Sequence, residues 1–253
     1  MNPHGVRTTR EGAELQVLLS RPDRLNALRT ADLIDLTEAV EAAADDDGVR
    51  VVLLAGEGRA FCSGADLASV VDASTVDAAN RAILALRRIG KPVIAAVGGA
   101  AAGVGCSLAL ACDLVIAKRS AYFLLAFADV GLMPDGGATA LVPAAVGRAR
   151  AMRMAMLAER IPAQTATEWG LISQVVDDDV FDTEVASVTT RLAAGPPLAY
   201  ARIKRAVDEA AMPALARALE IERTGQAELL RSRDYAEGVA AFKDRRKPKF
   251  TGT

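Results

Sequence analysis

Apolar runs alternate with helical patterns over most of the chain. Residues 14–19 begin by alternating polar and apolar positions and predict a strand, which follows a shorter one near residues 6–9. Two continuous apolar runs, residues 51–55 and 93–97, have the length and composition of buried strands. Strands that alternate with helices in this way predict an α/β fold with right-handed crossover connections.

Helical spacing of apolar residues predicts the elements between and after these strands. Thr30 is a suitable N-cap for a helix that carries Leu33 and Leu36 on one face. The last third of the chain shows helical patterns only. Further helices are expected over residues 76–88, 106–112, 136–147, 148–157, 162–169, 181–194, 196–210, 213–231 and 233–244, and further strands over 113–117 and 172–176.

Two glycine-rich segments follow the two apolar runs. The first is residues 61–68, Phe-Cys-Ser-Gly-Ala-Asp-Leu-Ala, and the second is residues 98–107, Gly-Gly-Ala-Ala-Ala-Gly-Val-Gly-Cys-Ser. Each predicts a strand, a glycine turn and the start of a helix, which leaves backbone N–H groups without partners at two helix N-termini. Groups of this kind stabilise negative charge that develops during a reaction.

Charge and length limit the partners of the chain. The 253 residues carry a formal net charge of −2, with no basic domain or stripe, so nucleic acid is not expected as a partner. The locally basic residues 243–249 are expected to be a solvated end that could meet a ligand phosphate. Residues 1–5 lack the apolar core of a signal peptide, and no run is long enough to span a bilayer. These features predict a cytoplasmic protein without membrane insertion.

Cysteine and histidine usage limits the chemistry. Cys62, Cys106 and Cys112 form no CxxC pair and are expected to be free thiols in a reducing compartment, most of them buried. His4 is the only histidine, so neither a metal site nor a serine nucleophile activated by histidine is expected. Residues 103–107 lack the third glycine of a dinucleotide motif and the Gly-Lys-Ser/Thr of a P-loop, so a nucleotide cofactor is disfavoured.

Together with their flanks, the two turns resemble the crotonase (enoyl-CoA hydratase/isomerase) superfamily, whose members stabilise the enolate of an acyl-CoA thioester. The resemblance implies an α/β crotonase (ClpP-like) spiral of repeated ββα units. Residues 1–195 would form the core with the CoA and oxyanion site. Residues 196–253 would close the pocket and assemble a homotrimer or homohexamer. The matching segments are residues 21–28, 61–67, 91–117, 130–137, 163–176 and 242–252.

The resemblance makes the backbone N–H groups of Ala65 and Val104 the two oxyanion donors. Val104 stands where many relatives have glycine, and a main-chain donor survives that change. Removing one such donor costs roughly 10²–10³ in rate, so two donors can carry much of the catalysis.

The resemblance also implies contacts to CoA, which would enter only as part of the substrate, so no separate cofactor is expected. Asp66 has a competing role as a cap of the helix expected after the first turn. Phe242 and Arg245 would act from a neighbouring subunit, and an ordinary terminal helix is the alternative. The implied substrate contacts are Leu25, Ala27, Gly64, Asp66, Leu67, Gly103, Phe127, Phe242 and Arg245.

The acidic groups distinguish the reactions of the superfamily. Its hydratases hold a water between two glutamates, at positions that carry Ser107 and Phe127 here, and neither of these can act as acid or base. Asp135 aligns instead with the acid of the isomerases and dehalogenases. A carboxylate in an apolar pocket has a raised pKa and can carry a proton from C2 to C4 of a 3-enoyl thioester. The alternative role for Asp135 is to cap the helix that opens at Gly136 and Gly137.

The sequence therefore favours an acyl-CoA isomerase with Asp135 as its proton shuttle, and an aromatic substrate of the 1,2-epoxyphenylacetyl-CoA kind stays open. A 2-enoyl-CoA hydratase is the alternative enzyme, and a dehalogenase or thioesterase with Asp135 as nucleophile is another. From a different class, the chain could be an acyl-CoA-binding protein that has kept the pocket and lost the chemistry.

Overall fold

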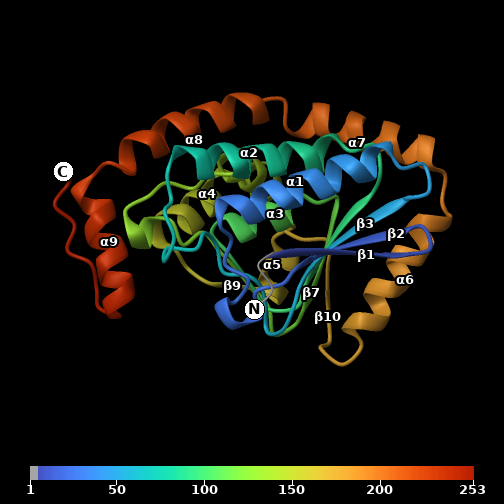
Figure 1. Ribbon diagram of the computed structural model, residues 1–253, viewed down its shortest axis with the longest axis horizontal. Coiled ribbons are helices and arrows are strands. Elements are labelled where there is room, and N and C mark those ends of the chain that lie inside the picture. The colour runs from blue at the N-terminus through green and yellow to red at the C-terminus, as the bar shows by residue number, and fades with distance from the viewer. Residues whose placement is uncertain (1–4) are drawn as a thin grey trace.

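The computed structural model describes residues 5–253 and contains two β-sheets surrounded by helices (Figure 1). His4 lies outside the described residues. Most neighbouring strands are parallel; β1 with β2 and β8 with β9 are antiparallel. The larger sheet has the order β1 (Val6–Glu11), β2 (Glu14–Leu19), β3 (Val51–Gly56), β5 (Val93–Val97), β7 (Leu114–Lys118), β10 (Gln174–Val176). The smaller sheet has the order β4 (Ala60–Cys62), β6 (Ala100–Ala102), β8 (Tyr122–Leu124), β9 (Ile161–Pro162).

The helices cover both faces of the larger sheet. Successive residues of β3 point to opposite sides, so that Val52 and Leu54 pack in the main core with α1 and α2, and Val51 and Leu53 pack toward α6. Two short 3-10 turns, η1 (Pro22–Arg24) and η2 (Ala128–Val130), lie in the loops. The helices are α1 (Thr30–Asp45), α2 (Ala73–Arg88), α3 (Val104–Ala111), α4 (Ala138–Leu157), α5 (Ala163–Glu168), α6 (Phe181–Ala194), α7 (Pro197–Ala211), α8 (Leu215–Leu229) and α9 (Arg233–Asp244).

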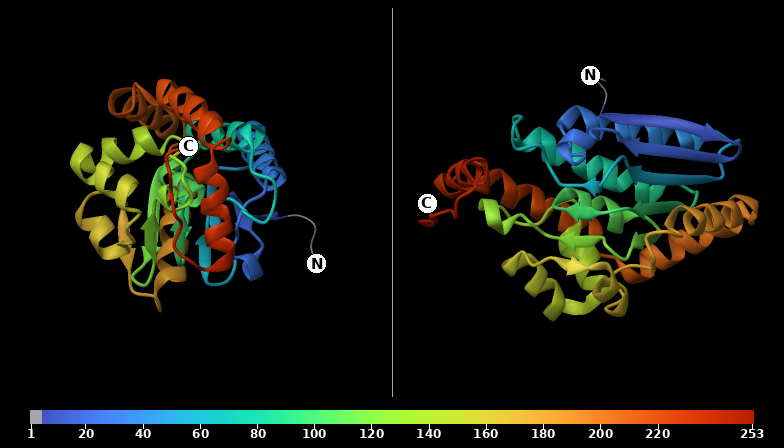
Figure 2. Two further views of the ribbon diagram at one scale, coloured as in Figure 1. Left: turned by 90° about the vertical axis from the view of Figure 1, so that its left-hand side faces the viewer. Right: turned by 90° about the horizontal axis from the view of Figure 1, so that it is seen from below.

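The order of elements confirms the α/β spiral of ββα units. The unit appears as β1-β2-α1, then as β3-β4-α2 and again as β5-β6-α3, and the chain is helical from α6 onward. Figures 1 and 2 show α7 and α8 running in succession along one side of the molecule and α9 turning back at its end. Helix α8 contacts both α2 and α4, so the helical last third packs onto the core of its own chain. No helix within residues 5–253 is long and apolar enough to cross a membrane.

Two details of the expected elements are wrong. Thr30 is the first residue of α1 instead of its cap; the preceding Arg29 holds the cap position, and its N–H donates to Asp32 Oδ2 at 2.8 Å. The smaller sheet is absent from the sequence prediction, because strands of two or three residues are too short to show a period.

The first glycine turn also differs from its prediction. Phe61 and Cys62 lie in β4, and no helix starts directly after the turn, because α2 begins only at Ala73. Asp72 caps that helix by accepting the N–H of Ser74 at 2.9 Å. The expectation that Asp66 caps a helix is therefore wrong, and of the two turns only the second leads directly into a helix.

Candidate active site

The two glycine turns meet at one end of the smaller sheet. Strands β4 and β6 are parallel neighbours, with Ala60 opposite Ala100, so the turns that follow them emerge at the same edge. A Cβ placed on Gly103 would lie 3.5 Å from Gly64 Cα, so the two backbones are in contact. Gly64 and Gly103 have φ angles of 107° and 53°, which glycine adopts without strain.

The N–H groups of Ala65 and Val104 come directly after these glycines. Val104 is the first residue of α3, where a backbone N–H has no acceptor within the helix. Ala65 forms a parallel bridge with Leu28 in which the Leu28 N–H donates to Gly64 O and the Asp66 N–H donates to Leu28 O, both at 2.9 Å. In residues 5–253 neither the Ala65 nor the Val104 N–H has an intramolecular acceptor. Both N–H groups are thus free to donate to a ligand, although only Val104 stands at a helix N-terminus.

Close packing of α3 on β4 fixes the position of the second turn. A Cβ on Gly105 would lie 2.6 Å from Cys62 Cβ and 2.7 Å from Cys62 O, so this approach requires glycine. Burial raises the pKa of the Cys62 thiol to about 12, and the thiol acts as a neutral packing group. All three cysteines are free, as the sequence predicts, and all three are buried, where burial was expected for only two of them.

The loop of residues 21–28 holds the first turn. Arg21 Nη2 donates to Asp66 Oδ2 at 2.8 Å, and Nη1 donates to Ala27 O at 2.7 Å. Buried Asn26 donates to the carbonyl of Glu57, in the connection between β3 and β4, and to that of Ala60, the first residue of β4. Burial raises the pKa of Asp66, but hydrogen bonds from Arg21 and from a backbone N–H outweigh it, and the net pKa is lowered. Asp66 is thus an ionised partner of Arg21.

The predicted CoA contacts near the first turn lie on one pair of loops. Leu25 has a φ of 52°, and its carbonyl accepts the Ser63 N–H at 3.0 Å. Ala27 is tied to Arg21 in the same loop, and half-buried Leu67 follows Asp66 in the facing loop. The fold thus brings Leu25, Ala27, Gly64, Asp66 and Leu67 together.

Asp135 lies in the loop that leads into α4, between α3 and α8. The Ser107 hydroxyl on α3 donates to the Asp135 backbone carbonyl at 2.7 Å, and Gln226 Nε2 on α8 donates to Asp135 Oδ2 at 2.7 Å. Asp135 is 7% exposed, and its Oδ1 has no hydrogen-bond partner within the described chain. One carboxylate oxygen is therefore anchored and the other remains available to a ligand.

The surroundings of Asp135 raise its pKa to near neutrality. Burial raises the pKa of Asp135 to about 7; the hydrogen bond from Gln226 lowers it, and the nearby Glu222 carboxylate raises it. A group with this pKa is present in both protonation states near neutrality, which suits a residue that first takes and then returns a proton.

Glu222 takes the capping role that the sequence left open for Asp135. Glu222 Oε2 accepts the Gly137 N–H at 2.7 Å, and Oε1 accepts the Thr139 N–H at 2.8 Å, both at the start of α4. The expectation that the Asp135 side chain caps this helix is therefore wrong. Glu222 and Gln226 were missed at the sequence level. The sequence does contain a sign of their importance. Glu222 and Gln226 follow Leu219 at helical spacing on the buried face of α8, so two polar residues occupy core positions.

The positions that carry the hydratase acids hold no carboxyl group. Ser107 is completely buried and Phe127 is 8% exposed, next to η2. Cys, His, Asp and Glu side chains within residues 5–253 form no group of three or more that could hold a metal ion.

Phe242 and Arg245 lie apart from these loops on α9, which packs against η2. A Cβ on Gly238 would lie 2.6 Å from the backbone of Val130. Phe242 is 64% exposed, and Arg245 is the exposed C-cap of α9, so neither side chain is buried against the site within one chain.

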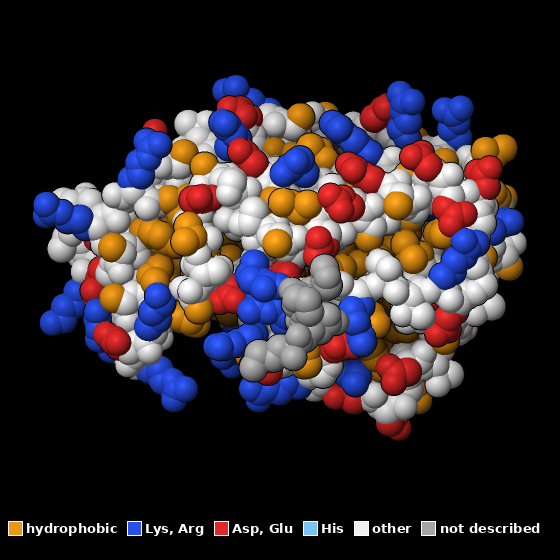
Figure 3. Space-filling view, viewed as in Figure 1, with side chains coloured by type: hydrophobic (Ala, Val, Ile, Leu, Met, Phe, Trp, Pro, Cys, Tyr) orange, Lys and Arg blue, Asp and Glu red, His pale blue; other side chains and the backbone are white. Residues whose placement is uncertain are grey.

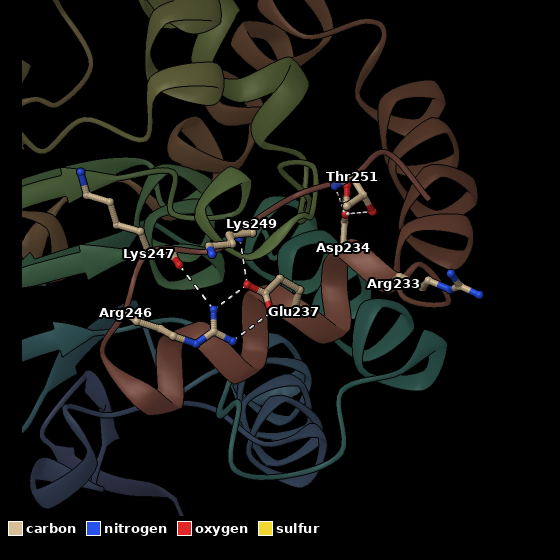
Figure 4. Close-up of a pocket in the computed structure, with 7 residues that line it drawn as sticks. All are labelled: Arg233, Asp234, Glu237, Arg246, Lys247, Lys249 and Thr251. Carbon is tan, nitrogen blue, oxygen red and sulfur yellow. Dashed lines mark hydrogen bonds and ion pairs between the residues drawn. The ribbon is translucent and has the colours of Figure 1, made fainter.

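The basic residues 243–249 are almost all exposed, as expected for a solvated end, and they fold back along α9. Arg246 pairs with Glu237 at 2.6 Å, and the Lys249 N–H donates to the same carboxylate at 2.8 Å (Figure 4). Asp234 accepts the Thr251 N–H at 2.6 Å. The acids of α9 are thus occupied by the tail of the same chain.

The model of the enoyl-CoA hydratase/isomerase family matches residues 9–253, which is nearly the whole chain. The chain belongs to this family. Its fold is the crotonase fold, as in a solved enoyl-CoA hydratase from Mycobacterium avium subsp. paratuberculosis K-10. That structure has a TM-score of 0.94 and 46% identity, and the match covers 98% of each chain.

Relatives within the enoyl-CoA hydratase/isomerase family include enzymes of both kinds. A 1,2-epoxyphenylacetyl-CoA isomerase of Escherichia coli (strain K12) is 41% identical over 252 residues, 96% of each chain. A 2,3-dehydroadipyl-CoA hydratase of the same strain is 36% identical over 248 residues, 96% of this chain and 97% of the relative. The protein is therefore an acyl-CoA enzyme of this family, and both reaction types occur at similar identity.

Proposed function

We propose that this protein is an enoyl-CoA isomerase that shifts a double bond through a thioester enolate, with Asp135 as the single proton shuttle. One observation carries the proposal. Asp135 is buried with one carboxylate oxygen anchored and one available, and its pKa is raised to about 7. Ser107 and Phe127 offer no second acid for holding a water.

The proposed reaction uses three groups. The thioester oxygen accepts hydrogen bonds from the N–H groups of Ala65 and Val104, and ionised Asp135 takes a proton from C2 of a 3-enoyl thioester. The C2–H bond breaks and negative charge moves onto the thioester oxygen, where the two donors stabilise it. Asp135 then returns the proton to C4, and the double bond moves from C3–C4 to C2–C3. No water takes part.

The loops around the first turn would bind the CoA portion of the substrate. Leu25 and Ala27 would contact the nucleotide through their backbone, with Leu67 facing them. Asp66 would act mainly through Arg21, which ties the two loops together. CoA enters and leaves with the substrate, so no resident cofactor is expected.

The chain is also proposed to assemble as a homotrimer or homohexamer in the cytoplasm. No residue of α7 is buried. Its apolar residues Leu198, Ile203 and Val207 are 83%, 57% and 57% exposed. Apolar side chains at this density on one helix are typical of an interface. In such an assembly Phe242 and Arg245 could reach the CoA of a neighbouring subunit.

A substrate comparison tests the proposal. Wild-type protein, Asp135→Asn and the control Asp129→Asn are each offered 3-enoyl-CoA and 2-enoyl-CoA. Asp129 is an exposed carboxylate on the neighbouring η2, so the control makes the same chemical change nearby. We expect turnover of 3-enoyl-CoA by wild type and control, and a loss of roughly 10²–10⁴ in rate for Asp135→Asn.

A 2-enoyl-CoA hydratase is the second candidate, favoured by the names of relatives such as the hydratase at 36% identity. Hydration of 2-enoyl-CoA that survives in Asp135→Asn would contradict the proposed mechanism. Binding of both thioesters without turnover would favour a non-catalytic acyl-CoA-binding protein.

A further inference from the structure

We propose that Glu222 and Gln226 on α8 are positioning residues that tune Asp135 in opposite directions: Gln226 holds its carboxylate and favours the anion, and Glu222 opposes the anion. This inference rests on the proposed role of Asp135 as proton shuttle. It gives the helical last third of the chain a role in the reaction, because α8 positions Asp135.

One face of α8 forms hydrogen bonds and packing contacts with the loop that carries Asp135. Gln226 donates through Nε2 to Asp135 Oδ2 at 2.7 Å, and its Oε1 accepts the Met133 N–H at 3.4 Å. Gly225 packs against Met133 so closely that a Cβ there would lie within 2.4 Å of Met133 Sδ. One turn earlier, Glu222 holds the start of α4 just beyond Asp135. Both sides of Asp135 are therefore fixed by the same helix.

Glu222 is a buried carboxylate that the fold keeps without a cation. Its side chain is completely buried, and it accepts hydrogen bonds from the Gly137 N–H, the Thr139 N–H and the Thr139 hydroxyl. None of the ion pairs found in residues 5–253 includes Glu222. Burial raises the pKa of Glu222 above its ordinary value, and the three hydrogen bonds at the start of α4 lower it only in part. When it is ionised, Glu222 places a negative charge close to Asp135.

Within residues 5–253, the elements packed around Asp135 offer no opposite charge that offsets this effect. From α3, Ser107 faces the Asp135 backbone, and from α2 the apolar Ile83 lies beside Gly136. The single charged residue of η2, Asp129, is exposed. The nearest cation along α8, Arg223, is half exposed and pairs with an aspartate of α2.

The two residues therefore act on the same carboxyl group with opposite sign. An amide donor stabilises the carboxylate, and removing it should make Asp135 harder to ionise. A neighbouring negative charge destabilises the carboxylate, and removing it should make Asp135 easier to ionise. General loosening of the loop would not produce two shifts of opposite sign.

The experiment compares Glu222→Gln, Gln226→Met and the control Glu228→Gln, which makes the same change at an exposed position of α8. Two titrations are recorded for each protein. One is the pH dependence of kcat/KM with 3-enoyl-CoA. The other is NMR of the carboxyl carbons in aspartate-labelled protein, in which the Asp135 signal is assigned by its loss in Asp135→Asn.

We expect both midpoints to move to lower pH in Glu222→Gln, to higher pH in Gln226→Met and to stay in place in Glu228→Gln. Freeing one carboxylate oxygen should also lower kcat of Gln226→Met by roughly 10- to 100-fold, with little change in KM. Thermal unfolding of each variant identifies any that fail to fold. If Glu222→Gln does not fold, Thr139→Val replaces it as a milder change to the same contacts. We expect the midpoints of Thr139→Val to shift as well, because Glu222 then loses the hydrogen bond from the Thr139 hydroxyl.

Equal shifts of the same sign, or no shift in either variant, would overturn the inference. The NMR titration separates this result from failure of the proposed function. Opposite NMR shifts in a protein without isomerase activity would support the tuning of Asp135 and contradict the isomerase. Isomerase activity that requires Asp135 but shows no shifts would support the isomerase and contradict the tuning.

Discussion

At the scale of single residues, Asp135 shows how burial prepares a carboxyl group for chemistry and what this costs the fold. Burial raises its pKa to about 7, far above that of an exposed aspartate. The folded chain therefore binds a proton at Asp135 more tightly than the unfolded chain. The contribution of this proton to the free energy of unfolding is fully present below the ordinary pKa of an aspartate. It is lost as pH rises through about 7.

Asp135→Asn should stabilise the protein at alkaline pH. The amide is neutral at every pH and can still accept the hydrogen bond from Gln226, so the variant avoids the cost of a buried charge. We expect a gain on the order of a few kcal/mol in unfolding free energy at about pH 8 and little gain at about pH 4. Urea unfolding at both pH values measures it, with exposed Asp47→Asn as control. A variant less stable than wild type at about pH 8 would contradict the account.

The residue scale also shows what the sequence could and could not predict. The predicted roles of Ala65, Val104 and Asp135 come from the resemblance to the crotonase superfamily, and the structure brings the two glycine turns together and buries Asp135. Glu222 and Gln226 lie more than eighty residues away along the chain, and no local pattern connects them to Asp135. Their pairing depends on where α8 packs, which is a property of the tertiary fold.

At the scale of elements, short strands place the two turns side by side. The long apolar strands β3 and β5 are predictable because five or six residues show their pattern. Strands β4 and β6 have three residues each and are hidden in glycine-rich segments. This is why the sequence places a helix directly after the first turn, where the structure has a bridge between Ala65 and Leu28.

Gly105→Ala should disturb the second turn. The added methyl group would overlap Cys62 on β4, so α3 must shift together with the Val104 N–H. We expect a loss of about 1–3 kcal/mol in unfolding free energy and slower turnover of 3-enoyl-CoA. Gly98→Ala is the control, because open space surrounds that position. Equal stability and activity for both variants would show that the close packing of α3 on β4 is unimportant.

At the scale of the whole molecule, α7 is attached to the core by charge instead of apolar burial. Lys204 donates to Asp113 at 2.9 Å, and Arg87 on α2 pairs with Asp208. Figure 3 shows charged side chains of both signs interspersed with apolar ones on the face that carries α7 and α8. The exposed apolar residues of α7 remain without partners in a single chain.

The double variant Ile203→Asp/Val207→Asp should dissociate the assembly. Two charges in an apolar interface are costly to bury, so we expect wild type to sediment as a trimer or hexamer and the variant as smaller species. Thr183→Asp, which adds a charge to an exposed position of α6, should sediment as wild type does. A monomeric wild-type protein would contradict the proposed assembly.

The pH dependence of isomerisation by the wild-type protein tests the role of Asp135 most directly. Asp135 must be ionised to take the proton from C2, and kcat/KM reports the ionisation of the free enzyme. We predict that kcat/KM for 3-enoyl-CoA rises with pH through a single midpoint near 7, where the pKa of Asp135 lies. A rate that is constant across neutral pH, or that falls as pH rises through it, would contradict Asp135 as the base.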